Sequence, residues 1–377
     1  MKENKTLQPF YLDLTESEIV EITEIFKEIL RTGQLILGKY TAQFEREFAD
    51  YIGSKYAVAL NSCTSALEIL LRLNKCSGNQ FAVQSNTNFA SVAAIIHAGG
   101  YPVFMDMDSN SFSPNLNILK RTLERNKSIT GVVWVHIGGI ICQDFPNVVE
   151  YCLKNNIVLI EDCAHAHGSM INSVYAGNWA NGGAFSFFPT KVMTTMEGGM
   201  ITTNNEEHYK LAKSFRNQGK RDGNYGGLHY DLGNSWRISE IAAYIGILQL
   251  SKLNEMIKKR QRAVTIISKS LNQANIEYIS SDHMNKASNY KFIIKLKPHH
   301  NIKSIKEQLK KEGINCGGGV YEIPCHLHPV FKDINYDKEN LITTELFCPN
   351  HICPPITSGT TDEDSNLMAE ALCKILR

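Results

Sequence analysis

Net charge and long hydrophobic runs are both nearly absent from this sequence. Its 377 residues include 39 Lys and Arg against 38 Asp and Glu, which gives a formal charge of +1. Such a balance does not favour nucleic acid or an anionic membrane as the main partner. The first residues lack the apolar core of a secretion signal, and no run of about 18 apolar residues occurs. We therefore expect a soluble, cytoplasmic protein with small-molecule ligands and neither nucleic acid nor membrane as a partner.

Cysteine is plentiful, but it is never paired at the spacing of a metal site. None of the ten cysteines forms a Cys-x-x-Cys pair, so the chain has neither a zinc motif nor a disulfide framework. Reduced thiols in the core are the expected arrangement. His165 and His167 are two positions apart, but no further cluster of ligand residues at suitable spacing accompanies them. We predict no metal site.

Short apolar runs rich in β-branched residues alternate with amphipathic helical patterns along most of the chain. The runs predict strands over residues 56–60, 80–84, 102–106, 131–136, 157–161, 183–188 and 201–203. Helical patterns cover residues 15–30, 67–73, 89–97, 116–125, 148–155 and 241–260. This alternation indicates an α/β fold in which helices cover both faces of a mostly parallel sheet.

A change of pattern near residue 262 indicates a second unit, and a chain of this length allows about two to three domains. The C-terminal part shows a strand over residues 290–296 and helices over 302–312 and 364–376. We therefore predict a large domain over residues 1–261, which includes the N-terminal helices and a glycine-rich loop over 220–231. A smaller α/β domain is predicted over residues 262–377.

A single lysine, Lys191, follows the apolar run 183–188 and the dipeptide Pro189-Thr190. At the edge of a buried strand its amine would be partly desolvated, and desolvation favours the uncharged, nucleophilic form. Such an amine can form a Schiff base with a carbonyl compound. The alternative is a solvated loop residue, which is the commoner case for lysine, so the surrounding residues must decide.

A polar turn of small residues joins the strand 56–60 directly to a helix. It reads Asn61-Ser62-Cys63-Thr64-Ser65-Ala66. Free backbone N–H groups at the start of a helix, with hydroxyl groups beside them, form a favourable site for an anion. Thr64 and Ser65 are the candidate ligands. Ser and Thr are also common as N-caps without any ligand, so the turn alone leaves both interpretations open.

Asp162 follows the strand 157–161, at the edge where ligands bind in parallel sheets. A carboxylate at the end of a buried strand requires a cationic or hydrogen-bonding partner. A protonated heterocyclic nitrogen would be one such partner. The alternatives are an N-cap or a structural ion pair.

Together these motifs resemble a known family. In chain order they read NSCTSALEIL, AGGYPVFMDMD, IEDCAHAHGS, GGAFSFFPTK, EGGMITTN, RNQG and LGNSWRISE. Their order and spacing resemble the DegT/DnrJ/EryC1/StrS sugar aminotransferases, which are fold-type I enzymes dependent on pyridoxal 5′-phosphate (PLP). The resemblance implies a mostly parallel central sheet in a large three-layer domain, plus a smaller C-terminal α/β domain.

The resemblance assigns roles to the candidate residues. Lys191 would carry the cofactor as a Schiff base and move a proton during the reaction. Asp162 would pair with the pyridinium nitrogen and keep it protonated. His165 stands where the family usually has glutamine, near the phenolic oxygen of the cofactor. Because histidine titrates near neutral pH, we expect an altered pH dependence.

The resemblance also implies how the phosphate of the cofactor is held. Thr64, Ser65 and Ser186 would provide hydroxyl and backbone groups. In the family an asparagine of the other subunit also reaches the phosphate. Here Ser235 aligns with that asparagine, and Asn234 precedes it. A homodimer with active sites at the subunit interface is therefore implied.

Two positions depart from the family's pattern. The ring of the cofactor is usually covered by an aromatic side chain, but Asn88 aligns there and Phe89 follows, which leaves two candidates for covering the ring. An aromatic residue of the family is replaced by Gly138, and we expect this change to widen the floor of the site or to alter the substrate held there.

Three further residues are candidates for substrate contact, namely His136, Tyr321 and His326. For the C-terminal pair, a surface loop with incidental histidines is the alternative. Asp106 and His136 also fall at the ends of predicted strands.

The predicted reaction is a transamination that passes through the pyridoxamine phosphate (PMP) form. An amino acid, expected to be L-glutamate, would donate the amino group to a ketone on a sugar or sugar-like phosphorylated or nucleotide-linked compound. A small phosphorylated ketone is the alternative acceptor. A dehydratase of the same fold would typically carry histidine in place of Lys191. A non-catalytic regulator would have no reason to keep Lys191, Asp162 and the hydroxyl-rich turn together.

Overall fold

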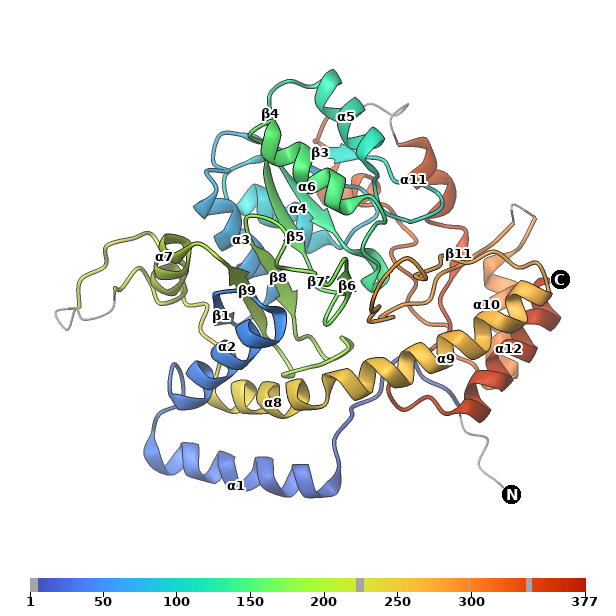
Figure 1. The fold of residues 1–377 in the computed structure, drawn as a ribbon, viewed down its shortest axis with the longest axis horizontal. Coiled ribbons are helices and arrows are strands. Elements are labelled where there is room, and N and C mark those ends of the chain that lie inside the picture. The colour runs from blue at the N-terminus through green and yellow to red at the C-terminus, as the bar shows by residue number, and fades with distance from the viewer. Residues whose placement is uncertain (1–5, 222–226, 298, 337–340) are drawn as a thin grey trace.

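A seven-stranded sheet forms the centre of the protein (Figure 1) in the computed structural model, which describes residues 6–221, 227–297, 299–336 and 341–377. The strand order is β1-β9-β8-β5-β4-β2-β3. The strands are β1 Tyr56–Leu60, β2 Gln80–Gln84, β3 Tyr101–Met105, β4 Ile129–Val135, β5 Val158–Asp162, β8 Gly183–Ser186 and β9 Gly199–Thr203. Only β9 runs antiparallel to its neighbours. The predicted mostly parallel sheet is confirmed.

Both faces of the sheet are buried, as the continuous apolar runs predict. Along β1, Ala57 and Ala59 belong to one hydrophobic cluster, whereas Val58 and Leu60 belong to another. This division follows from the geometry of a strand, in which successive side chains point to opposite faces. The sheet is therefore the middle of three layers.

Helices form the outer layers and connect the parallel strands. They are α1 Glu16–Thr32, α2 Lys39–Ile52, α3 Cys63–Leu73, α4 Phe89–His97, α5 Leu116–Arg125, α6 Phe145–Lys154, α7 Glu206–Arg216, α8 Glu240–Ser251, α9 Leu253–Gln273, α10 Ile302–Lys311, α11 Ile342–Phe347 and α12 Asp362–Leu376. The helix predicted over 241–260 is two helices, because α8 ends at Ser251 and α9 begins after Lys252. No described helix has the length and apolar character needed to cross a lipid bilayer.

A separate hydrophobic cluster organises the C-terminal part of the chain, where α9, α10 and α12 lie beside one another (Figure 1). Leu7 joins this cluster, and its N–H donates to the carbonyl of Gly313 at 2.8 Å. Helix α9 continues across the predicted division at residues 261 and 262. The two-domain division remains a prediction, with one long helix shared by the two proposed units.

The strand predicted over 290–296 is much shorter than expected. Only Ile294–Lys295 forms a strand, β10, which pairs with β11 at His351–Ile352. The residues just before it hydrogen bond to turns of the large sheet, where Lys291 N–H donates to the carbonyl of Gly138 at 3.1 Å. The Lys291 N–H therefore attaches this segment to the turn after β4, while the Ile293 carbonyl accepts from the Ile279 N–H at 2.8 Å.

Candidate active site

The C-terminal ends of the parallel strands surround a cavity of about 420 Å³. It is lined, among others, by seven of the predicted residues: Thr64, Asn88, Asp162, His165, Ser186, Lys191 and Tyr321. They lie at the ends of β5 and β8, shortly after β1, β2, β5 and β8, and in the C-terminal unit. Ligands bind at this edge of parallel sheets because strand-to-helix turns converge there.

Lys191 stands in the turn between β8 and β9. Its backbone N–H donates to the carbonyl of Phe188 at 3.0 Å, and the Phe187 N–H donates to the carbonyl of Gly198 at 2.9 Å. These bonds hold the base of the side chain in place. Nζ lies 4.9 Å from the centre of the Tyr290 ring. Among the described residues no carboxylate forms an ion pair with this amine, so the amine is available for reaction.

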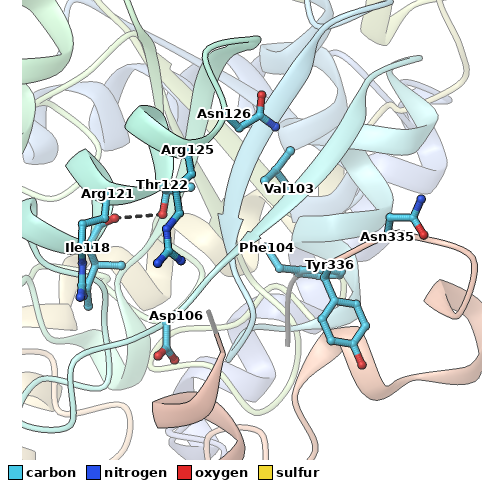
Figure 2. A pocket seen from close by; sticks show the side chains of 10 residues that line it. All are labelled: Val103, Phe104, Asp106, Ile118, Arg121, Thr122, Arg125, Asn126, Asn335 and Tyr336. Carbon is cyan, nitrogen blue, oxygen red and sulfur yellow. Dashed lines mark hydrogen bonds between the residues drawn. The ribbon is translucent and has the colours of Figure 1, made fainter. Parts of the chain in front are cut away.

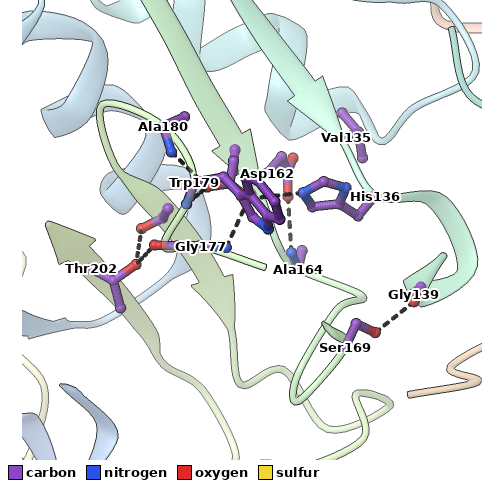
Figure 3. A network of polar contacts seen from close by, with 12 residues as sticks. Val135, His136, Gly139, Asp162, Ala164, Ser169, Gly177, Trp179, Ala180 and Thr202 are labelled. Atoms are coloured by element: carbon purple, nitrogen blue, oxygen red, sulfur yellow. Dashed lines mark hydrogen bonds and ion pairs between the residues drawn. The ribbon is translucent and has the colours of Figure 1, made fainter. Parts of the chain in front are cut away.

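Asp162 is the last residue of β5, and only 3% of its surface is exposed. Its carboxylate accepts a hydrogen bond from the Ala164 N–H at 3.1 Å (Figure 3). It accepts a second one from the Ser91 hydroxyl at 2.7 Å. Burial raises the pKa of Asp162, and these two bonds offset the effect only in part. A cationic N–H in the cavity would stabilise the charged carboxylate, so this residue fits the pyridinium nitrogen of PLP.

His165 is a fixed hydrogen-bond donor. Burial, with smaller contributions from Lys191 and Lys291, holds the pKa of His165 well below its usual value, so the ring is neutral. Nδ1 accepts from the Gly138 N–H at 3.3 Å, which places the proton on Nε2. Nε2 donates to the Tyr321 hydroxyl at 3.2 Å. The altered pH dependence expected from this residue is therefore not supported, because burial prevents the ring from titrating near neutral pH.

The start of α3 forms the other end of the cavity. The Thr64 hydroxyl has no hydrogen-bond partner among the described residues, and Ser186 also lines the cavity. Ser65 is different, since its hydroxyl donates to the Asn61 side chain at 2.7 Å and its N–H donates to the Ser62 hydroxyl at 3.1 Å. The structure brings Thr64 and Ser186 to the cavity, but it uses the polar groups of Ser65 within the turn.

Asn88, and not Phe89, faces the cavity. Asn88 is the N-cap of α4, and its side chain accepts from the Ala90 N–H at 3.0 Å. Phe89 is 46% exposed and stacks on Phe331, with ring centres 5.5 Å apart. Of the two candidates for covering the ring, the structure places only the amide side chain in the cavity, and its contact with the ring stays a prediction.

Gly138 does not widen the site, contrary to the expectation. A side chain at this position would meet the carbonyl oxygen of Lys291 at 3.2 Å and Ile293 at 3.3 Å. Its φ of 67° also favours glycine. The space that an aromatic side chain would occupy is taken by the segment before β10.

His136 and His326 are not in the cavity. His136 is fully buried, and its Nε2 hydrogen bonds to Glu161 at 3.0 Å. His326 hydrogen bonds through Nδ1 to the Ser85 hydroxyl at 2.5 Å and through Nε2 to Glu345 at 3.0 Å. Both side chains hold elements of the fold together, and the structure does not support their predicted contact with substrate.

Asn234 and Ser235 lie outside the cavity of their own chain. Ser235 forms a β-bridge with Asn217 and hydrogen bonds to the side chain of Arg237. The Asn234 carbonyl accepts from the Gln218 N–H at 2.9 Å. Their role in a neighbouring subunit remains a prediction. The predicted loop over 220–231 lies partly outside the described residues, which omit 222–226.

Among the residues that sequence reasoning missed are Ser91 and Tyr290, which contact the predicted site residues from outside the cavity lining. Ser91 bonds to Asp162 from the first turn of α4, and a serine within an apolar helix is a weak signal that was available. Tyr290 stacks on His165, with ring centres 4.3 Å apart, and lies close to Lys191. No local pattern indicates that contact, because it joins residues that are far apart in the chain.

Tyr321 combines a cavity position with an unusual backbone. Its φ is 66°, in the left-handed region that non-glycine residues seldom adopt. Such backbone strain persists where the surroundings enforce it, often at functional sites. Burial also raises the pKa of the Tyr321 phenol well above its usual value. The hydroxyl therefore stays protonated beside His165.

A larger cavity of about 590 Å³ lies between α5 and the segment at Asn335 and Tyr336 (Figure 2). Arg121 and Arg125 line it from α5, and it contains none of the predicted site residues. Its Asp106 carboxylate accepts bonds from Thr343 and Thr344 and so serves the start of α11. The chemistry of the lining, and not its size, distinguishes the active site.

An unpaired lysine and a buried carboxylate face one cavity at the end of a parallel sheet, beside a hydroxyl-lined helix start. This arrangement defines the class of fold-type I, PLP-dependent enzymes. The chain belongs to the DegT/DnrJ/EryC1/StrS aminotransferase family, whose family model matches residues 16–373. It is an aminotransferase and, like its family, it uses PLP.

Individual relatives cover almost the whole chain. An uncharacterised protein of Methanocaldococcus jannaschii is 31% identical over 98% of this chain and 97% of its own length. The GDP-perosamine synthase of Caulobacter vibrioides is 28% identical over 90% of this chain and 91% of its own. A Streptococcus pneumoniae protein solved in its PLP form has a TM-score of 0.88 and 25% identity, with 98% of each chain covered.

Proposed function

We propose that this aminotransferase moves the amino group of L-glutamate to the keto group of a nucleotide-linked sugar. The observation that carries the proposal is the placement of the Lys191 amine and the buried Asp162 carboxylate in one cavity with the start of α3. The name of the Caulobacter relative, a GDP-perosamine synthase, supports a sugar substrate. A small phosphorylated ketone is the second candidate acceptor, because Asn88 stands where the family has an aromatic side chain.

When bound, PLP supplies the electron sink that transamination requires. Lys191 holds the cofactor and transfers the proton that must leave one carbon and reach another. Asp162 would face the ring nitrogen of the cofactor and keep it protonated. The Nε2–H of His165, which donates to the Tyr321 hydroxyl in this structure, would be available to the phenolic oxygen of the cofactor, because the Gly138 N–H keeps the proton on Nε2.

The phosphate of the cofactor would bind at the N-terminus of α3, where Thr64 would contribute its hydroxyl and Ser186 a second one. We propose further that the active enzyme is a homodimer and that Asn234 and Ser235 reach the phosphate of the neighbouring subunit. Their location outside the cavity of their own chain is consistent with this arrangement.

The role of Lys191 is tested with the Lys191→Ala variant. We expect loss of the visible absorbance of the cofactor-bound enzyme and loss of turnover. In the wild type, hydride reduction followed by mass spectrometry of the peptides should find the cofactor attached to Lys191. Lys210→Ala is a suitable control, because Lys210 is an exposed residue that pairs with Glu206 on α7. Unchanged transamination by Lys191→Ala would overturn the assignment.

The acceptor is tested by mixing the PMP form with a panel of nucleotide-linked keto sugars and small phosphorylated ketones. Return of the absorbance of the PLP form identifies the compounds that accept the amino group. We expect nucleotide-linked sugars to be the better acceptors. A response to phosphorylated ketones alone would replace the sugar by the second candidate. Release of water from a sugar without amino transfer would indicate a dehydratase.

A further inference from the structure

We propose that Lys291 binds the anionic group of the substrate that reacts at Lys191. The ligand would be a carboxylate or phosphate a few bonds away from the reacting carbon. This inference rests on the proposed function and adds a residue that recognises the substrate. It concerns the segment before β10, which sequence analysis assigned to a strand.

The amines of Lys291 and Lys191 lie around the same aromatic ring. Lys291 Nζ is 5.4 Å from the centre of the Tyr290 ring, and Lys191 Nζ is 4.9 Å from it. The two amines are thus no further apart than the sum of these distances. Lys291 is not among the residues that line the cavity, so an acidic group a few bonds from the reacting carbon would extend past the Tyr290 ring to reach its amine.

The segment that carries Lys291 is attached to two turns, the one after β4 that contains Gly138 and the one after β5 that contains His165. Gly138 and Gly139 have φ values of 67° and 87°, and a side chain on Gly139 would lie 2.0 Å from the Ser288 hydroxyl. Because both positions are glycine, the segment approaches closely enough for Lys291 N–H to reach the Gly138 carbonyl at 3.1 Å. The Ser288 hydroxyl also donates to the His165 carbonyl at 2.8 Å.

Lys291 has no counter-ion of its own. It is half-buried, and among the described residues no carboxylate forms an ion pair with it. A partly desolvated ammonium group is stabilised by an anion, and the interaction is stronger than in bulk water. Lys295 on the same segment shows the contrast, since its amine lies 3.4 Å from the carboxylate of Glu277.

The surroundings of Tyr290 show that this side of the site is electropositive. Burial raises the pKa of the Tyr290 phenol, but Lys191, Lys291, the Thr190 hydroxyl and Arg260 outweigh burial, so that the pKa is lowered overall. Both lysines also contribute to the low pKa of His165. An anionic substrate would enter a field of the opposite sign.

The space beside the amine is kept open by glycine. A side chain on Gly318 would lie 3.9 Å from Lys291 Nζ, and the φ of Gly318 is 76°. This glycine belongs to the run 317–319 that leads to Tyr321, which lines the cavity. A larger residue at 318 would cover the amine from that side.

The test compares Lys291→Met with the wild type in the two half-reactions, each followed by the absorbance of the cofactor. The PLP form is mixed with L-glutamate, and the PMP form with the best acceptor of the panel. We expect the half-saturating concentration to rise about tenfold to a hundredfold in one half-reaction. Lys291→Arg should restore most of the affinity. Lys295→Met, a loss of charge on the same segment, should leave both concentrations unchanged.

The outcomes separate the possible ligands. If the half-saturating concentration rises with glutamate alone, Lys291 binds a carboxylate of the donor. If it rises with the acceptor alone, Lys291 binds the phosphate of the acceptor. Equal values in Lys291→Met and wild type, with normal PLP binding by both, would overturn the inference. An equal rise of the half-saturating concentration in Lys291→Arg and Lys291→Met would also overturn it, since the effect would then come from altered side-chain packing and not from the lost charge. If the wild type reacts in neither half-reaction, the proposed function itself is wrong.

Discussion

Glu161 and Asp162 are adjacent carboxylates at the end of β5, and both are buried, with exposures of 0% and 3%. Their side chains point to opposite faces of the sheet. Glu161 accepts hydrogen bonds from the N–H groups of Gly177, Trp179 and Ala180 and from His136. Asp162 accepts two bonds and faces the cavity that contains Lys191.

The difference shows how one strand supports both the fold and the reaction. Strand β7 spans Val174–Tyr175. The carboxylate oxygens of Glu161 are fully used in holding the turn that follows this strand against β5. Asp162 keeps capacity for a cationic partner. Burial alone therefore does not distinguish a structural carboxylate from a functional one, whereas the number of protein donors around it does.

The largest expected effect is on turnover when Asp162 is replaced by Asn. Removal of the charge that faces the ring nitrogen should lower kcat by about a hundredfold or more. In the PLP-bound enzyme the thermal midpoint should change little, because the amide oxygen can still accept from the Ala164 N–H and the amide NH2 can donate to the Ser91 hydroxyl. Steady-state kinetics and thermal unfolding measure the two effects. Wild-type turnover in this variant would remove Asp162 from the mechanism.

Replacement of Glu161 by Gln should have the opposite profile. An amide cannot accept all of the N–H donors around it, and unsatisfied buried donors cost about 1–3 kcal/mol each. We expect the free energy of unfolding, measured in urea, to fall by about 2–4 kcal/mol. The turnover of the remaining folded, PLP-bound enzyme should stay near that of the wild type. A selective loss of kcat with unchanged stability would place Glu161 in the reaction instead.

A smaller effect is expected in the pH dependence of stability without cofactor. Burial raises the folded-state pKa of Asp162 above 3.8, so the folded state holds this proton more tightly than the unfolded state does. Below pH 3.8 Asp162 is protonated in both the folded and the unfolded state, so its burial as a charge costs no folding free energy. Stability is lost as pH rises through the raised folded-state pKa. Asp162→Asn should therefore be more stable than wild type at neutral pH, and the advantage should disappear on acidification. Denaturant unfolding of the cofactor-free proteins from pH 3.5 to 7 measures it.

The smallest effect is expected for His165→Gln. The ring of His165 is already neutral and acts as a donor through Nε2, and glutamine can supply a donor of the same kind. We expect kcat to change by less than about tenfold, the size of one neutral hydrogen bond. The pH profile of kcat should keep its shape. A shift of the acidic limb in His165→Gln would show that the histidine titrates during turnover.

Local patterns in the sequence were enough to find much of the site. Lys191, Asp162 and Thr64 each follow a strong strand signal at a turn, so their positions at one edge of a parallel sheet follow from the order of strands and helices. The same reasoning failed for His136, which also follows a strand but contacts Glu161. The pattern places the residue at the edge, but it does not give the partner of the side chain.

Contacts over long distances in the chain were beyond such reasoning. The side chain of His326 hydrogen bonds to Ser85 and Glu345, and Tyr290 stacks on His165. Gly138 was interpreted as added space because its neighbour across the fold, the segment before β10, was unknown. In each case the side chain was judged without the residues that pack against it.

The order of apolar runs and polar turns by itself determined a mostly parallel sheet with helices on both faces, and it placed Lys191 and Asp162 at one edge of that sheet. These features depend on short-range periodicity and on the chain direction of each strand. The resemblance to a family added the cofactor and the role of the lysine. The tertiary structure alone decided which buried polar groups are already paired and which still need a ligand. That balance separates Asp162 from Glu161, and Lys291 from Lys295, because it depends on donors and acceptors brought together from distant parts of the chain.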